Sequence, residues 1–521
     1  MKNYIIKTAL SILIGSSLFT TGCNKFLEEQ DPSNLSPDNY YTLPEHADAA
    51  VYAAYARARF IGSGAGIFSA NFQMLDAPTG TAVTATAQNS DLNNLLGLVY
   101  DGDNLHVRQF WTGAYRVIAQ ANLALEKIPG INPMDEAQKK RTLGEAAFMR
   151  AWAYFYVVRL WGPVPLVTKP QTPASSDFYP NRTSVDSVYN QIVADLKMAE
   201  ESGLPWMDAS GRVGLAAIKT ELAKVYLTMA GYPLRKDEYY RLAADKAKEV
   251  IDYAKTHTGE INLFETYDQL HSVANNNKIE HLFQVQYLAD IEGNPMQSLM
   301  LPNNSLAKNI SAMGSGVGSS VPSSSFYDSY KKFEPKDKRT DNRQFFFTSY
   351  FVDGKGDPFT LDRPYIFKHF DYAAHGVQGT AGTGRSNLNM MNIRYAETLL
   401  IYAEAQNQAD DNPNADAYDA LNRVRARAGL DPLSGLSADA FEQAVWRERW
   451  HEFAYEGITW FDMVRLKKVY NEDNNGFDNF EGHINKNSGR ALETKHLLFP
   501  LPIQEMRNNP NLRPQNDGYG S

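Results

Sequence analysis

Apolar residues recur at helical spacing along much of the chain. Large and small apolar side chains between Phe148 and Phe155 stand at i, i+3, i+4 and i+7 within GEAAFMRAWAYFYVVRLWG (144–162), which predicts a long helix with an aromatic face. The same spacing recurs in residues 222–229 and 396–403. Further helices are expected over 47–60, 104–128, 184–202, 236–255, 415–428 and 438–468. The first of these is expected to start at Thr42, an N-cap residue followed three positions later by Glu45.

Short connections between these helices favour antiparallel helix hairpins. Small residues and large aromatics alternate on helices of this length, a pattern that resembles tetratricopeptide repeats, in which each hairpin buries its face on the next. The chain is therefore predicted to be all-α, with a tetratricopeptide-repeat-like scaffold over about 40–255 and about 390–510.

The pattern changes between about 256 and 389. This part contains three consecutive asparagines (275–277), the stretch GSGVGSSVPSSSF (314–326) and the glycine-rich HGVQGTAGTG (375–384). Such stretches do not continue a helix, and they exceed the length of ordinary connections. Loops on a rigid scaffold often carry binding residues. We expect a long loop-rich insertion, which either binds a ligand or is a surface insertion without one.

The first 23 residues predict export. Lys2 and Lys7 precede an apolar run (9–19), and the small residues 20–22 lead to Cys23, the only cysteine. The run is too short for a mature membrane span, so residues 1–22 are predicted to be a signal peptide and 23–521 a single domain. The position of Cys23 resembles a bacterial lipobox, which implies an acylated Cys23; an ordinary secretory signal is the alternative.

Charge and motif content exclude several classes of protein. Lys and Arg number 51 against 60 Asp and Glu, so no basic excess favours nucleic-acid binding. A single cysteine excludes an internal disulfide and a zinc site with several thiolates. The chain has no HExxH, GxSxG or GxxxxGK[ST] motif. The acidic turns at 101–104 and 472–475 do not fit a twelve-residue calcium loop, so no metal or cofactor is predicted.

Three glutamates fall four residues apart in RERWHEFAYEG: Glu448, Glu452 and Glu456. We expect them on one helical face, where neighbouring arginines favour ion pairs. Candidate partners across helices are Arg394, Glu404, Arg423, Arg425 and Arg427. Carboxylates at this spacing also meet the distance that glycoside hydrolysis requires, although the sequence indicates no cleft beside them. A helical glycoside hydrolase therefore stays open as an alternative.

Seven segments, in order, resemble the SusD/RagB family of bacterial outer-membrane lipoproteins. They are FLEEQDPSNLSPDNYYT (26–42), FWTGAYRVIAQAN (110–122), RLWGPVPLV (159–167), NIRYAETLLIYAEAQNQ (392–408), ALNRVRARAGL (420–430), WRERWHEFAYEGITWFDMVRLK (446–467) and LFPLPIQEMRNNPNLRPQN (498–516). The resemblance implies a non-catalytic, lipid-anchored receptor on the cell surface that captures oligosaccharides for a SusC-like TonB-dependent transporter. Relatives typified by RagB are associated with peptides, so peptide capture is an alternative, as is a purely structural scaffold.

A sugar ring offers flat C–H faces surrounded by hydroxyl groups, so a glycan receptor needs aromatic planes beside amide or carboxylate groups. Three loop clusters combine these groups. They hold, first, Phe68, Phe72, Asp76, Asp91, Asn93, Asn94, Tyr100 and Asp101; second, Tyr287, Asn303, Asn304, Phe326 and Tyr327; and third, Tyr350, Arg363, Tyr365, His369 and Tyr372. All of them except Phe72, Asn94, Asn303, Tyr350 and His369 are predicted ligand contacts.

Overall fold

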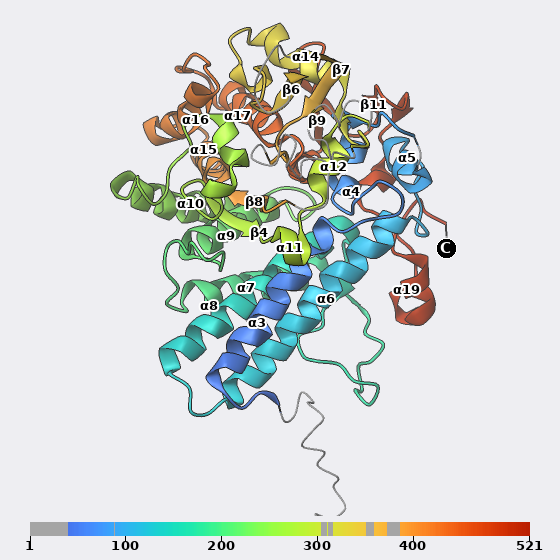
Figure 1. Ribbon diagram of the computed structural model, residues 1–521, viewed down its shortest axis with the longest axis vertical. Coiled ribbons are helices and arrows are strands. Elements are labelled where there is room, and N and C mark those ends of the chain that lie inside the picture. Colours follow the sequence, from blue (N-terminus) through green and yellow to red (C-terminus); the bar gives the residue numbers. More distant parts are fainter. Residues whose placement is uncertain are drawn as a thin grey trace, which may run out of the picture.

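The computed structural model describes residues 40–87, 89–303, 310, 316–350, 359–371 and 386–520. The signal peptide and Cys23 lie outside these ranges. The predicted all-α scaffold is confirmed: long helices stack side by side through the molecule (Figure 1). They are α3 (Pro44–Ala58), α6 (Leu105–Lys127), α7 (Glu136–Trp161), α8 (Val185–Glu200), α9 (Leu215–Ala230), α10 (Glu238–Thr256), α15 (Tyr395–Asp410), α16 (Ala415–Arg427) and α17 (Ala438–Phe453).

Local signals explain where the longest helix begins and ends. The Asp135 side chain accepts a hydrogen bond from Gln138 N (2.8 Å) and caps α7. Gly162, with φ of +72°, follows its last residue and takes a backbone conformation that glycine adopts without strain. Trp152 and Phe155 are fully buried between the neighbouring helices. The aromatic face predicted for this segment therefore lies in the main core.

Two predicted helix boundaries differ from the structure. Leu43, not Thr42, precedes the first residue of α3. The helix expected over 438–468 is divided into α17 and α18 (Thr459–Leu466), because Tyr455 and Gly457 adopt left-handed φ angles of +64° and +70°. The chain cannot continue a right-handed helix through two such residues, and the turn between α17 and α18 results.

The insertion leaves the scaffold after α10 and returns just before α15, and these two helices pack directly against each other. Strand β4 (His281–Val285) pairs antiparallel with β8 (Met390–Arg394), which closes the insertion at its base. The insertion is less irregular than its composition predicts. It contains α11 (Ala289–Glu292), α12 (Met296–Met300), α14 (Ser324–Phe333), β5 (Val321–Pro322), β6 (Phe346–Tyr350) and β7 (Phe359–Ile366).

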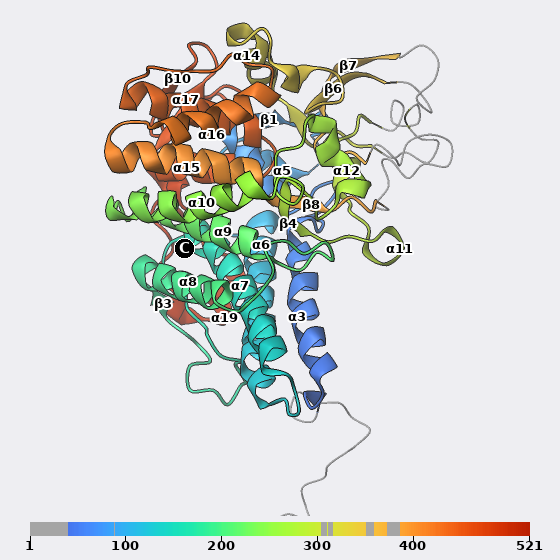
Figure 2. The same cartoon turned by 90° about the vertical axis from the view of Figure 1, so that its left-hand side faces the viewer.

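The remaining elements are short. They are α4 (Gln73–Asp76), α5 (Ser90–Leu96), α19 (Ile503–Asn508), β1 (Ala82–Val83), β2 (Val164–Pro165), β3 (Arg182–Thr183), β9 (Lys468–Asn471), β10 (Gly476–Asn479), β11 (Ile484–Asn485) and β12 (Arg490–Ala491). The strands form two-stranded antiparallel pairs. Of the insertion elements, α11, α12, β6 and β7 lie on the right-hand side of Figure 2, whereas α14 lies at the top, above α17.

Candidate functional site

Strand pairing brings the first loop cluster against the insertion. Strand β1 pairs with β5, and Ala85 N donates a hydrogen bond to Gly318 O (2.8 Å). Beneath this pairing, side chains from both regions share a small second core that includes Val83, Val321 and Tyr365. We call residues 62–70, 82–87, 89–98, 287–303, 316–323 and 359–371 the loop-rich face. The predicted clusters, distant in sequence, therefore meet in the fold.

Phe68 presents an exposed ring on this face. Its side chain is 49% exposed and that of the adjacent Ile67 is 62% exposed. The Phe68 backbone has φ of +52°, a left-handed conformation that is rare and strained for an aromatic residue. Both the strained backbone and the exposure of a large apolar ring to water lower the stability of the fold. This combination marks residues 62–70, which we call the Phe68 loop, as a candidate ligand contact.

Buried polar side chains brace the Phe68 loop. Asn89 Nδ2 donates to Ala65 O and Ile67 O, both at 3.0 Å. The Ser69 hydroxyl lies 2.6 Å from both Gln73 Oε1 and His106 Nε2. Burial lowers the pKa of His106 to about 4, so its ring is neutral at pH 7. These hydrogen bonds brace the loop on both sides of Phe68.

Gln73 and Gly62 join the Phe68 loop to the insertion. Gln73 Nε2 donates to Ser319 O (3.2 Å), on the far side of the β1–β5 pairing. A Cβ atom at Gly62 would lie 2.4 Å from the Tyr287 hydroxyl, so only glycine fits there without a shift. Tyr287 leads toward α11. Leu288, just before this helix, is 51% exposed, and Ile291, within it, is 78% exposed. The sequence prediction missed these two aliphatic side chains, because nothing in their local pattern shows that they stay exposed.

Helix α5, which is tied to the Phe68 loop through Asn89, carries amide and carboxylate side chains. Asp91 and Asn93 are half-buried, and Asn94 is exposed. Asp91 Oδ1 accepts from Leu105 N (3.2 Å), and Asn93 Nδ2 donates to Ala87 O (3.1 Å). Each of these side chains keeps lone pairs or a second N–H for an added partner. Asp101, further along, is exposed and accepts from Asp103 N (2.9 Å) within its own turn.

Several predicted ligand contacts are buried instead of facing solvent. The Tyr100 ring is 5% exposed and stacks on Phe499 with 5.0 Å between the ring centroids. Tyr365 is 1% exposed, and its hydroxyl donates to Asp362 Oδ1 (2.9 Å). The other buried members are Asp76, Tyr287 and Phe326. In this structure the five side chains pack inside the protein, and a sugar could reach them only after neighbouring side chains moved.

The remaining predicted contacts are spread over other positions. Tyr327 is half-buried and packs edge-to-face on Phe346, with centroids 5.1 Å apart. Arg363 is exposed and pairs with the adjacent Asp362 (3.2 Å). Asn304 and Tyr372 lie outside the described residues. The predicted contacts that share the exposed loop-rich face with Phe68 are therefore Asp91, Asn93 and Arg363.

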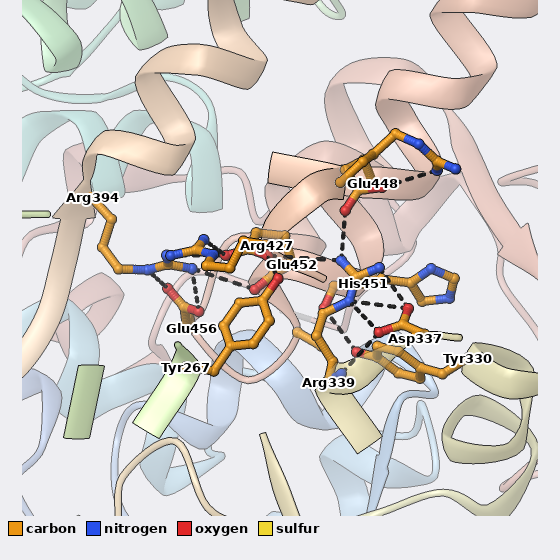
Figure 3. A network of polar contacts seen from close by, with 12 residues as sticks. Tyr267, Tyr330, Asp337, Arg339, Arg394, Arg427, Glu448, His451, Glu452 and Glu456 are labelled. Atoms are coloured by element: carbon orange, nitrogen blue, oxygen red, sulfur yellow. Dashed lines mark hydrogen bonds and ion pairs between the residues drawn. The ribbon is translucent and has the colours of Figure 1, made fainter. Parts of the chain in front are cut away.

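The glutamates of RERWHEFAYEG belong to a buried ion network (Figure 3). Glu452 Oε1 lies 2.6 Å from Arg427 Nη2 and 3.1 Å from Arg394 Nη1. Glu448 Oε1 lies 2.7 Å from Arg339 Nη1. The predicted pairing is thus confirmed for Arg394, Arg425 and Arg427. Glu404 pairs instead with Arg465, and the Arg423 guanidinium donates to Asn262 Oδ1 and to the Tyr395 hydroxyl. The expectation of one shared helical face is wrong for Glu456, which lies beyond the end of α17 and reaches the network from the following turn.

Burial and charge shift the two helical glutamates in opposite directions. Burial raises the pKa of Glu448. Burial acts in the same direction on Glu452, but the positive charges of Arg427 and Arg394 outweigh it and leave the pKa of Glu452 below its usual value. Glycosidases also separate the pKa values of two carboxyls. Here, however, Glu448 and Glu452 are 2% and 0% exposed, so a substrate has no access to them.

The network holds the insertion on the scaffold. Lys368, which follows β7, places Nζ 2.6 Å from Glu452 O and 2.7 Å from Glu456 Oε1. Arg339, also from the insertion, pairs with Asp337 (2.7 Å) as well as with Glu448. Buried ion pairs of this kind add little net stability, but breaking one leaves an uncompensated charge. Their role here is to fix where the loop-rich face sits.

The described ranges contain neither a membrane-spanning helix nor a metal-binding cluster. Among their helices, none combines the length and the apolar composition that crossing a bilayer requires. Within the same ranges, no three His, Cys, Asp or Glu side chains gather in a way that could hold a metal ion.

Comparisons with known proteins cover the scaffold and the insertion. A family model described as "SusD family" matches residues 279–519, and one described as "Starch-binding associating with outer membrane" matches 25–227. SusD-like protein P2 of Formosa agariphila is 28% identical, with all of both chains aligned. A crystal structure of a SusD superfamily protein from Parabacteroides distasonis is 34% identical, with a TM-score of 0.83, covering 93% of this chain and 100% of the other. A laminarin-binding SusD-like protein, 24% identical, has the same fold, with a TM-score of 0.72 and coverage of 92% and 100%.

Proposed function

This chain belongs to the SusD family, and from that premise we propose that it is a non-catalytic glycan-binding protein of the outer membrane. It captures oligosaccharides at the loop-rich face and delivers them to a SusC-like TonB-dependent transporter. The description of the matching N-terminal model, with its starch binding and outer-membrane association, supports this assignment. So does the binding of laminarin by a protein of the same fold.

The observation that carries the proposal is the Phe68 loop. A flat ring held outward by a strained but braced backbone provides a stacking surface for the C–H face of a sugar. Asp91 and Asn93 supply carboxylate and amide groups for the surrounding hydroxyls. Because hydrogen bonds to hydroxyls largely replace hydrogen bonds to water, we expect an affinity of roughly micromolar to millimolar. Weak capture suits a protein that passes its ligand onward.

The burial of the glutamates supports a binding role without catalysis. A glycosidase needs one carboxyl as acid and another as base or nucleophile on either side of an accessible glycosidic bond. The carboxylates of Glu448 and Glu452 are instead enclosed by Arg339, Arg394 and Arg427. These two carboxylates therefore have a structural role.

Membrane attachment is proposed to depend on Cys23. The cysteine directly follows small residues at the end of an apolar run, the arrangement that precedes acylation in bacterial lipoproteins. Acyl chains at Cys23 would tether the domain through the segment that precedes α3, and more than one chain makes such an anchor stable. The transporter is expected to contact the domain over a large, partly apolar surface.

Affinity electrophoresis tests the proposed function. Native gels that contain starch, laminarin or xyloglucan should retard the wild-type protein, and Phe68→Ala should migrate faster in the retarding gel. Phe68→Tyr keeps the ring and serves as the matched variant, and Leu242→Ala, at an exposed position of α10, controls for loss of an apolar surface group. Unchanged retardation of Phe68→Ala contradicts the assignment of the site. If the protein captures peptides and none of the three glycans, the proposed ligand class is wrong.

A further inference from the structure

A hollow lined with aromatic side chains lies between α6, α19 and the connection from α7 to α8. Its volume is about 670 Å³, and its lining includes Tyr115, Phe178 and Tyr179. Phe178 is 40% and Tyr179 55% exposed. Helix α19 lies to the left in Figure 2, whereas α11 and α12 of the loop-rich face lie to the right. We call this hollow the α19 groove; it is separate from the site described above.

The exposed rings of the α19 groove are held in place. Asn511 Nδ2 donates to Tyr179 O (2.6 Å), and Asn509 Nδ2 donates to Pro180 O (2.8 Å). The rings of Phe178 and Tyr179 meet edge-to-face, with their centroids 5.1 Å apart. On the opposite wall, the Tyr115 hydroxyl donates to Pro165 O (2.9 Å), which orients that ring. Two large rings fixed in water at the rim of a hollow are unfavourable unless they meet a partner.

The α19 groove also contains two charged side chains. Glu505 and Arg116 both line the groove, and in the part of the chain that the structure describes neither side chain forms an ion pair or a hydrogen bond. Burial raises the pKa of the Glu505 carboxyl. This contrasts with the buried network, where Arg394 and Glu452 are paired on several sides. The groove therefore presents one hydrogen-bond acceptor, Glu505, and one donor, Arg116, to a ligand.

We infer that the α19 groove is a second oligosaccharide-binding site, in which Tyr179 and Phe178 stack on sugar rings while Glu505 and Arg116 bind hydroxyl groups. The ligand class rests on the proposed function; the location rests on the groove alone. Two weak sites on one domain can hold two stretches of the same polysaccharide. The second contact is then intramolecular, which raises the retention of a long chain far above that of a short one.

The test combines groove variants with the loop variant. Tyr179→Ala, Glu505→Gln and Arg116→Ala are made in the wild-type protein and in Phe68→Ala, with Tyr179→Phe as the matched control that keeps the ring. Retention is measured in native gels that contain starch, laminarin or xyloglucan, and folding by thermal unfolding. We expect Tyr179→Ala to lower the apparent affinity for the retained polysaccharide about tenfold, Tyr179→Phe to leave it unchanged, and Glu505→Gln and Arg116→Ala to lower it in the same direction.

The outcomes separate this inference from the proposed function. If the groove variants leave retention unchanged in both backgrounds while Phe68→Ala reduces it, the α19 groove is not a glycan site and the proposed function stands. If Tyr179→Ala abolishes retention while Phe68→Ala does not, the groove is the glycan site and the assignment to the Phe68 loop falls. Co-purification of each variant with a SusC-like transporter is measured in parallel; if it is lost at unchanged retention, the groove is a protein interface and the inference is overturned. Retention of the wild type on none of the three polysaccharides overturns both.

Discussion

The side-chain amide of Asn89 donates a hydrogen bond to the backbone carbonyl of Ile67, 3.0 Å away, and so ties the residue before Phe68 to the start of α5. The same side chain accepts a hydrogen bond from Leu92 N (2.9 Å), which caps α5. A single residue thus sets the position of the exposed ring relative to Asp91 and Asn93. A ligand meets a face that is already ordered, which reduces the entropy lost on binding.

Replacing Asn89 should weaken glycan binding, even in a variant that keeps the cap of α5. Asn89→Ala removes the cap of α5 and both hydrogen bonds to the Phe68 loop, so we expect the free energy of unfolding to fall by about 1–3 kcal/mol. Asn89→Asp keeps the capping oxygen but lacks the amide donor, so it should release the Phe68 loop while α5 stays capped. Both variants should bind the retained polysaccharide more weakly in affinity gels. Normal binding by Asn89→Asp would show that the brace is not needed.

Asp76 should make stability depend on pH. Burial raises the pKa of this carboxyl from 3.8 to about 8, against the opposing effect of the Gly457 backbone N–H and Lys368. Between these two values the folded state binds a proton that the unfolded chain releases, so this group makes stability fall as pH rises from about 4 to about 8. Asp76→Asn should remove that fall, with a gain relative to wild type on the order of 1–5 kcal/mol at pH 8 that shrinks toward pH 4.

Chemical denaturation of both proteins at pH 4.5, 6 and 8 measures this difference. Two parallel stability curves would mean that Asp76 is ionised in the folded protein.

Glu456 makes stability depend on pH in the opposite direction, and at lower pH. Burial opposes its ionisation, but Arg394 and Lys368 lower its pKa from 4.5 to about 2, so the stability it provides is lost as pH falls through that interval.

Changing the helical glutamates should damage stability without revealing an enzyme. Glu452→Gln leaves Arg394 and Arg427 without one of their counter-charges, so we expect a loss of about 3–5 kcal/mol in the free energy of unfolding. Surface variants such as Leu242→Ala should cost less than about 0.5 kcal/mol. No reducing ends should be released from starch or laminarin by the wild type, Glu448→Gln or Glu452→Gln. Release by the wild type that either variant abolishes would establish hydrolysis.

Cys23→Ala should convert a membrane-associated protein into a released one. Without the thiol no acyl chain can be attached, and the remaining apolar run of the signal peptide is too short to serve as a stable span. Membrane and soluble fractions are compared by immunoblot, with metabolic labelling by a fatty acid as the direct assay of acylation. A Cys23→Ala protein that still sediments with outer membranes places the anchor elsewhere.

The scaffold could be predicted because its signals are local. Phe148, Trp152 and Phe155 mark the buried face of α7 within a few turns of helix, and their burial follows from that spacing. The break between α17 and α18 could not be predicted in the same way. It depends on Tyr455, whose hydroxyl donates to Thr81 O (2.9 Å), a contact between opposite ends of the chain. Helical periodicity carries no information about such a distant partner.

The candidate site was harder to predict for the same reason. Phe68 and Tyr100 both occupy a loop with acidic and amide neighbours, so the two look equivalent in the sequence. The fold covers Tyr100 with Phe499 and His496 but leaves Phe68 in solvent. The C-terminal segment packs beside Tyr100 and not beside Phe68, and this contact decides which ring is exposed. Each segment of the loop-rich face carries suitable side chains in the sequence, but nothing in the sequence predicted that these segments meet in the fold.

A crystal structure of the protein soaked with a laminarin or starch oligosaccharide tests the central claim most directly. The account predicts a sugar ring stacked on the exposed face of Phe68, with hydroxyl groups within hydrogen-bond distance of Asp91 or Asn93, and with the Phe68 loop in the conformation described here. A bound oligosaccharide that leaves Phe68 bare, or one that is cleaved in the crystal, would contradict it.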